Sequence, residues 1–334
     1  MTTYKGINGT AVQNFAGDLP GAVDGQVWYD STSSDFKYQN TNAAGAWVTG
    51  NNLNTARETL GGAGTQTSAV VFGGHHPPTN SNKTESYNGT NWTEVNDLNT
   101  TRRQVGGTGT DNTNALTFGG DTSTGSTGQT AVTESWNGTN WTEVNDLGTA
   151  RQSVGSAGAS NTSALCFGGG KVPLGAVTAD TELWNGTNWT EVNDLNTARR
   201  APIGAGTQTS AISMGGTPPI MNSAETWNGT NWTAITSMAN ARSEGAGFGT
   251  DNTLALVTAS YGSPGPSTFA LTEQWNGSAW SEQADLNTAR YAAGGGPNAP
   301  GTAGLIAGGG APASSAATEE WNKPLIVVET ITTS

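Results

Sequence analysis

The sequence predicts an all-β protein made of six copies of one four-stranded unit, and three recurring markers support this prediction. The first is an arginine that returns every 43 to 49 residues: Arg57, Arg102, Arg151, Arg199, Arg242 and Arg290. The second is a tryptophan with the same spacing: Trp47, Trp92, Trp141, Trp189, Trp232 and Trp280. The third is a glutamate two residues before an aromatic residue, as in Glu134 and Trp136. Self-similarity at a fixed period is the signature of a repeat architecture.

The composition agrees with an all-β chain and argues against several functions. Among 334 residues there are 48 glycines and 12 tryptophans, but lysine and arginine together number only 13. Abundant Gly, Asn, Thr and Ser favour turns and strands over helices, and the tryptophans supply rigid apolar anchors. The formal net charge of −13 argues against nucleic acid and anionic membranes as partners, because both attract basic patches. No apolar stretch approaches the roughly twenty residues of a membrane-spanning helix, and the N-terminus lacks the apolar run of a signal peptide.

Residues 1–46 differ from the repeats and form an N-terminal extension. Residues 25–30, 31–34 and 35–39 are typical of a strand, a polar turn and a second strand, that is, a β-hairpin. This hairpin resembles short modules in tail-fibre and other virion proteins of bacteriophages. We expect its aromatic residues Trp28, Tyr29 and Phe36 to be exposed and to attach the chain to other virion proteins or to sister chains.

Each repeat contains four short segments with strand character. The first follows the arginine and is rich in small residues, and the second is apolar and usually ends in Gly-Gly, as in 70–74. The third has the form Thr-Glu-x-Trp, and the fourth begins at the second tryptophan. Asn-Gly joins the third segment to the fourth and predicts a tight hairpin, because both residues tolerate positive φ. The longest variable loops, 120–131, 169–179 and 260–270, follow the second segment.

Four strands per unit, this period, Gly-Gly after the second strand and Trp in the fourth resemble the kelch repeat. The likeness covers residues 47–322 and implies a six-bladed β-propeller of four-stranded blades. The fifth unit departs from the pattern, because residues 257–260 read Val-Thr-Ala-Ser in place of the Gly-Gly ending. This departure leaves the turn in the fifth unit undefined.

The two ends of the array are complementary. Trp47 has no Glu-x-Trp segment ahead of it, and Trp321 has no second tryptophan after it. We therefore expect the Trp47 segment to supply the outer strand of the last unit, which removes open sheet edges between the first and last units. An alternative is that residues 325–328 supply this strand; residues 323–334 otherwise form a C-terminal strand or tail.

The titratable residues favour a structural role over catalysis. The repeated Arg and Glu residues are expected to orient neighbouring strands by charge-assisted hydrogen bonds, with Arg151 pairing with Glu134 or Glu182. His75 and His76 have no third histidine or cysteine with which to complete a zinc site, and Cys166 lies alone in an apolar segment. Copper-dependent kelch oxidases and sialidases are also propellers, but their residue sets are not matched. We expect no enzymatic activity, metal or cofactor.

For function, the repeats, the N-terminal hairpin and the Asn/Thr/Gly/Ser-rich composition resemble structural proteins of bacteriophages, notably of marine phages and cyanophages. This resemblance implies an exposed virion component, either a tail-fibre adhesin or a head decoration protein, and is compatible with a homotrimer. A carbohydrate- or protein-binding kelch module of cellular origin is the alternative from another class. Recognition of a host surface glycan or protein is expected in loops on one face. The residues named for it are His75, His76, Thr122, Lys171, Pro218 and Tyr261.

Overall fold

The structure is a computed structural model, and it describes residues 12–19, 26–40, 45–173, 175–263, 267–310, 313–323 and 327–331. All regular elements in these residues are β-strands, which confirms the predicted all-β class. The chain forms two compact units. The large unit is Ala46–Asn322, and the small unit combines Met1–Gly45 with Lys323–Ser334.

The described part of the large unit contains six four-stranded antiparallel sheets. Sheet 1 is β5 (Gly61–Thr65), β6 (Ser68–Phe72), β9 (Thr84–Tyr87) and β10 (Trp92–Val95). Sheet 2 is β11 (Gly106–Asp111), β12 (Asn114–Phe118), β13 (Thr133–Trp136) and β14 (Trp141–Val144). Sheet 3 is β15 (Gly155–Ser160), β16 (Ser163–Phe167), β19 (Thr181–Trp184) and β20 (Trp189–Val192).

The last three sheets follow the same plan. Sheet 4 is β21 (Ile203–Gly206), β22 (Ala211–Met214), β23 (Ala224–Trp227) and β24 (Trp232–Ile235). Sheet 5 is β26 (Ala246–Asp251), β27 (Leu254–Thr258), β30 (Thr272–Trp275) and β31 (Trp280–Gln283). Sheet 6 is β32 (Gly294–Gly295), β33 (Ala303–Ala307), β34 (Thr318–Asn322) and β4 (Ala46–Gly50), so it draws strands from both ends of the repeat array.

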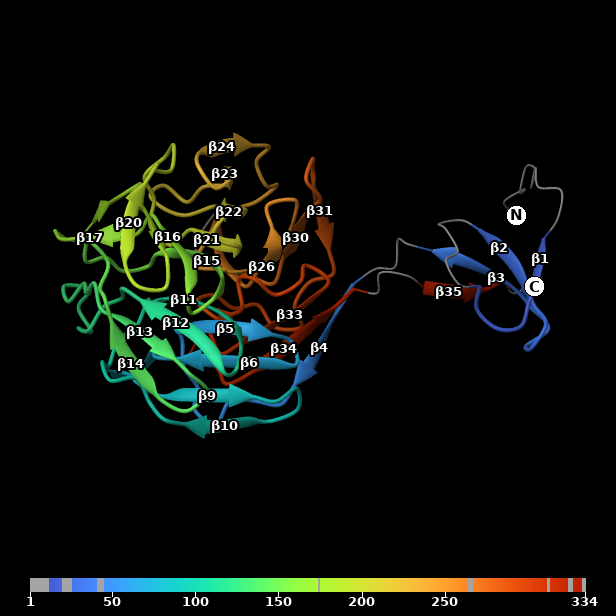
Figure 1. Cartoon of the computed structure of the whole chain (residues 1–334), viewed down its shortest axis with the longest axis horizontal. Helices are drawn as coiled ribbons and strands as arrows, with labels where there is room; N and C mark the ends of the chain where they lie inside the picture. The colour runs from blue at the N-terminus through green and yellow to red at the C-terminus, as the bar shows by residue number, and fades with distance from the viewer. Residues whose placement is uncertain are drawn as a thin grey trace. The chain divides into compact units, whose positions relative to one another are not determined.

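The first strand of each sheet lies toward the middle of the large unit. Strands β5, β11, β15, β21, β26 and β32 contact one another in this order, and β32 also contacts β5. Figure 1 shows the first strands near the middle and the fourth strands, such as β10, β14 and β24, toward the rim. The burial of each strand follows its place: β16 is buried except at its first residue, whereas β14 buries only its leading Trp141. The strands thus change in composition from the middle of the unit to its rim: small residues in the first strand, apolar residues in the second, and a mixture of apolar and polar residues in the two outer strands.

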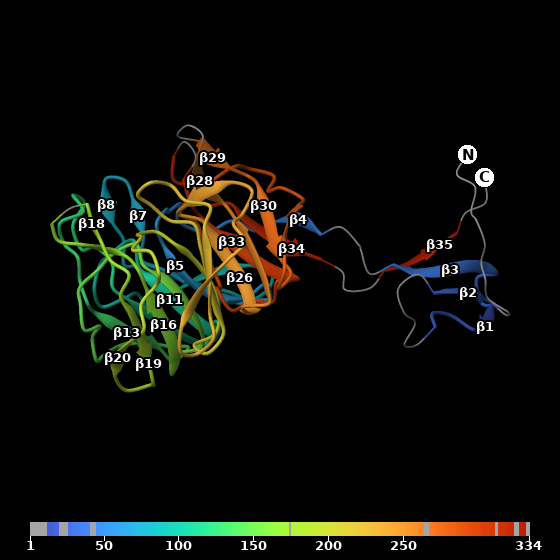
Figure 2. The same cartoon turned by 90° about the horizontal axis from the view of Figure 1, so that it is seen from above.

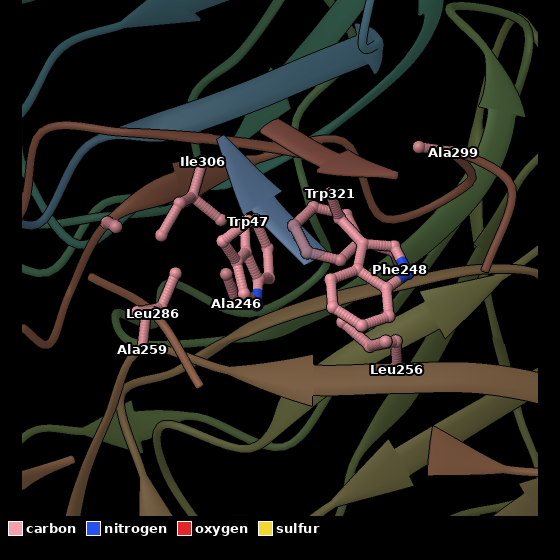
Figure 3. Close-up of a cluster of buried hydrophobic side chains, with 10 residues drawn as sticks. Trp47, Ala246, Phe248, Leu256, Ala259, Leu286, Ala299, Ile306 and Trp321 are labelled. Carbon is pink, nitrogen blue, oxygen red and sulfur yellow. The ribbon is translucent and has the colours of Figure 1, made fainter. Parts of the chain in front are cut away.

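Sheet 6 has the arrangement expected from the incomplete repeats at the two ends of the array. Strand β4 pairs antiparallel with β34, and Trp47 lies opposite Trp321. Their ring centroids are 5.4 Å apart, and Trp47 also lies 6.2 Å from the ring of Phe248 in sheet 5. Figure 3 shows these rings together with Leu256 and Ile306 in one apolar cluster. Each buried aromatic side chain in such a cluster contributes roughly 2 to 3 kcal/mol.

Indole hydrogen bonds connect consecutive sheets. The second tryptophan of one sheet donates its Nε1–H to the Thr Oγ1 that opens the third strand of the preceding sheet, as Trp141 does to Thr84 at 3.0 Å. The same bond joins Trp189 to Thr133, Trp232 to Thr181, Trp47 to Thr272 and Trp92 to Thr318. Sheet 5 departs from this pattern, because Ala224 stands at the threonine position and Trp280 donates to the Thr236 carbonyl instead.

Two turns differ from expectation in detail. In the Asn-Gly turns only the glycine has positive φ, 88° at Gly89, while the Asn88 side chain accepts hydrogen bonds from the N–H groups of Thr90 and Asn91. The loop is therefore built on a side-chain turn, with one residue at positive φ. In the fifth unit, Ala259 takes φ 52°, close to the 63° of Gly73, so the chain makes a similar left-handed turn without the glycine.

The small unit is a four-stranded sheet in the order β1 (Gln13–Phe15), β2 (Val27–Asp30), β3 (Asp35–Asn40) and β35 (Val327–Thr330). The expected hairpin is present, since β2 pairs antiparallel with β3. The alternative role for residues 325–328 is wrong for the two that are described, because 327 and 328 lie in β35 and pair with β3. Residues 325 and 326 lie outside the described residues.

The hairpin aromatics are less exposed than expected. Trp28 is fully buried, and its indole N–H donates to the Gly17 carbonyl at 3.2 Å, so the expectation that it forms an exposed attachment surface is wrong. Tyr29 is half-buried against Phe36, which is 46% exposed. A small sheet has few apolar residues with which to build a core, and Trp28 is the largest of them.

Candidate functional site

Each repeated arginine forms a buried ion pair with the glutamate in the third strand of the sheet that follows it. We call this pair the clasp. Arg151 lies 2.7 Å from Glu182, one of the two partners suggested by the sequence, and its Nη1 donates to the carbonyls of Gly168 and Asp180. The same pairing occurs in the other five sheets: Arg57 with Glu85, Arg102 with Glu134, Arg199 with Glu225, Arg242 with Glu273 and Arg290 with Glu319. Both members are buried throughout. Burial lowers the pKa of Arg57 and Arg102, and the paired glutamates oppose this shift. These arginines therefore face protein atoms and are unavailable to a ligand.

The residue after each arginine pairs through its backbone with the loop that follows the second strand. It forms a β-bridge with the segment after the second strand: Glu58 with His75, Arg103 with Asp121, Gln152 with Gly170, Arg200 with Thr217 and Tyr291 with Gly310. Ser243 makes the equivalent pair with Tyr261 through β25 (Ala241–Ser243) and β28 (Ser260–Ser263). The loops carry β7 (His75–His76), β8 (Thr79–Asn80), β17 (Gly170–Lys171), β18 (Ala176–Val177) and β29 (Ser267–Phe269). Figure 2 shows β7, β8, β18, β28 and β29 at one end of the large unit, which we call the ring end.

The second residue after each arginine belongs to a ring of six residues joined by backbone hydrogen bonds, and the ring end is named after it. All six have positive φ between 51° and 55°, although none is glycine: Thr59, Gln104, Ser153, Ala201, Glu244 and Ala292. The backbone N–H of each donates to the carbonyl of the preceding member, from Gln104 to Thr59 onward, and Thr59 donates to Ala292. These six bonds, 2.7 to 3.2 Å long, form a closed circuit. A left-handed backbone is costly for non-glycine residues and is retained where the surrounding structure imposes it, often at functional sites.

The ring encloses a cavity of about 100 Å³ lined by its six members and by the six residues that follow them. The following residues are mainly apolar: Leu60, Val105, Val154, Pro202, Gly245 and Ala293. Below these lining residues, the first strands of neighbouring sheets lie so close together that only glycine fits at some positions. A Cβ at Gly204 would lie 2.1 Å from the Ser156 carbonyl oxygen, and one at Gly107 would lie 2.7 Å from the Gly62 carbonyl oxygen. A second cavity of about 100 Å³ continues below the ring cavity between the first strands, and it shares the six residues that follow the ring. We call the upper cavity the mouth; its polar chemistry is set by the six ring side chains.

Charge at the mouth is concentrated on one side. Glu244 belongs to the ring, and burial raises its pKa; Arg200 opposes this shift, and the nearby Glu58 carboxylate adds a smaller increase. Burial also raises the pKa of Tyr291, with Glu58 and Glu244 adding to the effect. A Cβ placed on Gly310 would lie 2.3 Å from Glu58 Oε2 and 3.2 Å from the Tyr291 ring, so Glu58 and Tyr291 lie side by side. This side of the mouth favours donors of hydrogen bonds.

Two of the six loop residues proposed from the sequence contact residues that immediately precede ring members, although neither lines the cavity. His75 Nδ1 lies 3.5 Å from Glu58 Oε1, and Tyr261 stacks edge-on against Tyr291 with centroids 5.8 Å apart. The other four make local contacts: His76 with the Ala56 carbonyl, Thr122 with Gly128 and Lys171 with Asp180, while Pro218 follows a cis peptide bond. They lie on the same loops but have no described contact with the mouth.

Sequence reasoning missed the ring residues themselves. The repeats vary among Thr, Gln, Ser, Ala and Glu at this position, two residues after an invariant arginine, and that contrast was the available signal. Two buried acceptors near the mouth, Gln104 Oε1 and Gln152 Oε1, have no hydrogen-bond partner among the described residues. Buried acceptors of this kind are normally satisfied by water or by a ligand. The mouth can therefore accept hydrogen bonds from a polar group.

Among the described residues, no cluster of three or more His, Cys, Asp or Glu side chains is arranged to hold a metal ion. No described helix is long and apolar enough to cross a membrane. A scan against models of known protein families found no match, and a search of curated proteins found no relative of significant similarity.

Proposed function

We propose that the large unit is a six-bladed β-propeller and that the chain is a non-enzymatic recognition protein, a tail-fibre or adhesin-type component of a bacteriophage virion. In this proposal the six sheets are the blades, and sheet 6 closes the ring with strands from both ends of the array. The small unit attaches the chain to other virion proteins, through the exposed Phe36 rather than the buried Trp28. The location on the virion rests on the resemblance of the repeats and hairpin to phage proteins.

The observation that carries the recognition role is the hydrogen-bonded ring. Six backbone positions are held in one strained conformation, while their side chains are free to differ. A rigid frame that displays variable polar side chains suits recognition, because little conformational freedom is lost on binding. The repeated arginines are buried and paired with glutamates, so they cannot take part in a reaction at the mouth, and this favours binding as its role.

The ligand we propose is a projecting polar group of a host surface glycan or protein. A cavity of about 100 Å³ holds one such group rather than a whole sugar chain. In the lining, Gln104 supplies an unpaired acceptor and Glu244 a carboxylate, so hydroxyl and amide N–H groups match it; Glu58 and Gln152 each immediately precede a lining residue in the chain. The surrounding loops, with His75 and Tyr261, would contact the rest of the molecule.

The test compares binding of purified chains to an array of bacterial surface polysaccharides. A Gln104→Asn, Glu244→Asn double variant shortens two ring side chains, and asparagine tolerates positive φ. The control is Thr187→Ala, in an exposed Asn-Gly turn. We expect the wild type and the control to bind, and the double variant to lose binding without melting at a lower temperature than the wild type. Equal binding by all three proteins would exclude the mouth, and mass spectrometry of purified virions tests the virion assignment separately.

A further inference from the structure

An asparagine fills a gap beside the fourth strand in four of the six sheets. It stands three residues before the clasp arginine: Asn54, Asn99, Asn196 and Asn287. Its Nδ2 donates to Oε2 of the clasp glutamate at 2.7 to 2.9 Å and to the carbonyl of the second tryptophan at 3.1 to 3.4 Å. In these sheets a neutral donor with two hydrogens therefore bridges a carboxylate and a backbone oxygen.

The other two sheets lack this side chain and have cavities in its place. Gly148 replaces the asparagine in sheet 3, beside a cavity of about 120 Å³, and Ala239 replaces it in sheet 5, beside one of about 280 Å³. The second tryptophans here, Trp189 and Trp280, are half-exposed, whereas the other four are at most 7% exposed. Each cavity also contains the clasp glutamate of its sheet.

Further departures from the repeat enlarge the cavity of sheet 5. Ala224 removes the threonine that holds the tryptophan indole in other sheets, and Trp280 donates to Thr236 on the cavity wall instead. Ala279 stands where four other repeats have an asparagine before the tryptophan. Three alanines, Ala224, Ala239 and Ala279, therefore replace larger polar residues of the repeat near the Trp280 side chain.

The lining of this cavity offers hydrogen-bond acceptors and an aromatic side chain. Glu273 Oε2 accepts from the backbone N–H of Ala239 and lacks the asparagine amide that donates to this atom in the four filled sheets. Asn240 donates its backbone and side-chain N–H groups to the other oxygen, Oε1, at 3.3 and 3.5 Å. The asparagine amide that donates to the tryptophan carbonyl in the four filled sheets is replaced by Ala239 here, and Glu282 adds an exposed carboxylate. Arg242 is buried and committed to Glu273 and the Leu271 carbonyl, so no cation lines the cavity. Carboxylates beside an aromatic ring favour a positively charged donor.

We propose that the cavity of sheet 5 binds an alkylammonium group, as carried by a lysine side chain or an amino sugar. The ammonium takes the place of the missing asparagine amide: it donates to Glu273 Oε2 and the Trp280 carbonyl, lies against the Trp280 ring and is attracted by Glu282. The smaller cavity of sheet 3 is a weaker candidate, because Lys171 of the chain itself pairs with Asp180 on its wall. This site shares no residue with the mouth and does not depend on the virion proposal.

The experiment uses ligand-observed NMR with the full chain and two amines, Nα-acetyl-lysine methylamide and glucosamine, which distinguish the two sources. Their neutral counterparts are Nα-acetyl-norleucine methylamide and N-acetylglucosamine. We expect at least one amine to bind with a dissociation constant of about 1 mM, and its neutral counterpart to bind at least about tenfold more weakly. Equal binding of an amine and its neutral counterpart, or no binding at all, would overturn the proposal.

Variants locate the site. Ala239→Asn installs the group that fills the same place in four sheets, and it should abolish binding without lowering the melting temperature. The matched control Gly148→Asn fills the cavity of sheet 3 and should leave binding unchanged. Glu282→Gln, on an exposed strand, should weaken binding at least about threefold even if Ala239→Asn fails to fold. Amine binding that survives Ala239→Asn or Glu282→Gln unchanged, or that Gly148→Asn removes, would contradict the assignment.

Discussion

Trp92 donates its indole N–H to Thr318 Oγ1 at 3.0 Å, across 226 residues of sequence. The bond joins sheet 1 to sheet 6, and it repeats the contact between Trp141 and Thr84 in consecutive sheets. The junction between the two ends of the repeat array is therefore built like the junctions within it. A substitution that removes this hydrogen bond should therefore lower the free energy of unfolding as much as the same substitution at a junction between two consecutive sheets.

Replacing Trp92 by phenylalanine should test that junction. The substitution removes the indole N–H and leaves a cavity and a buried threonine hydroxyl, so we expect a loss of about 2 to 3 kcal/mol in the free energy of unfolding. Trp280→Phe is the matched control, since Trp280 is partly exposed and its indole N–H donates to the Thr236 backbone carbonyl rather than to a threonine hydroxyl. Denaturant unfolding of both variants measures the difference, and equal losses would show that the Thr318 bond adds nothing.

The clasp arginine is a second target. Arg151→Ala leaves Glu182 as an uncompensated buried charge, and we expect a loss of about 3 to 5 kcal/mol. An Arg151→Met, Glu182→Leu double variant removes both charges and should recover part of that loss. Thermal unfolding with the polysaccharide array as a second readout distinguishes the roles: unchanged stability with lost binding would make the arginine a binding residue.

Three features of the repeats could be predicted from the sequence. The recurring Trp, Glu and Arg residues indicated the third and fourth strands and the pairing of Arg with Glu. The Trp47 segment, which has no third strand ahead of it, indicated the strand that lies beside Trp321. The positive φ of Thr59 and Ala292 could not be predicted, because neither residue favours that conformation and only the ring of bonds enforces it. The pairing of β35 with β3 was missed because a short apolar segment does not specify its partner.

Stability should depend on the protonation of Glu244. Burial and Glu58 raise its pKa in the folded chain, so the folded state binds this proton more tightly than the unfolded state. Its contribution is fully favourable below the ordinary pKa of glutamate and is lost as pH rises through the raised value. Glu244→Gln should therefore raise the melting temperature at pH 8 and change it little at pH 4. Glu282→Gln is the exposed control, and a similar pH trend in both variants would contradict the prediction.

Cys166 should be unreactive in the folded chain. Its thiol is fully buried in β16, and burial raises its pKa to about 12, so almost no thiolate exists at pH 8. We expect no reaction with a disulfide-exchange reagent until denaturant is added, when one thiol per chain should react. Rapid reaction without denaturant would show that sheet 3 opens or packs differently.

Sheet 6 is the element on which the ring, its mouth and the proposed recognition role all depend. Ala46 and Asn322 are cross-strand partners in β4 and β34, and both are exposed. Partners of this kind have Cα atoms about 4.5 to 5.5 Å apart, within disulfide range, so an Ala46→Cys, Asn322→Cys variant should form an intrachain disulfide on oxidation. The control pair Val48→Cys, Asn322→Cys is out of register and should form it poorly. Intact-mass measurement under oxidising and reducing conditions reads the result: an intrachain disulfide in the first variant supports the closed arrangement, and free thiols or only disulfide-linked dimers would contradict it.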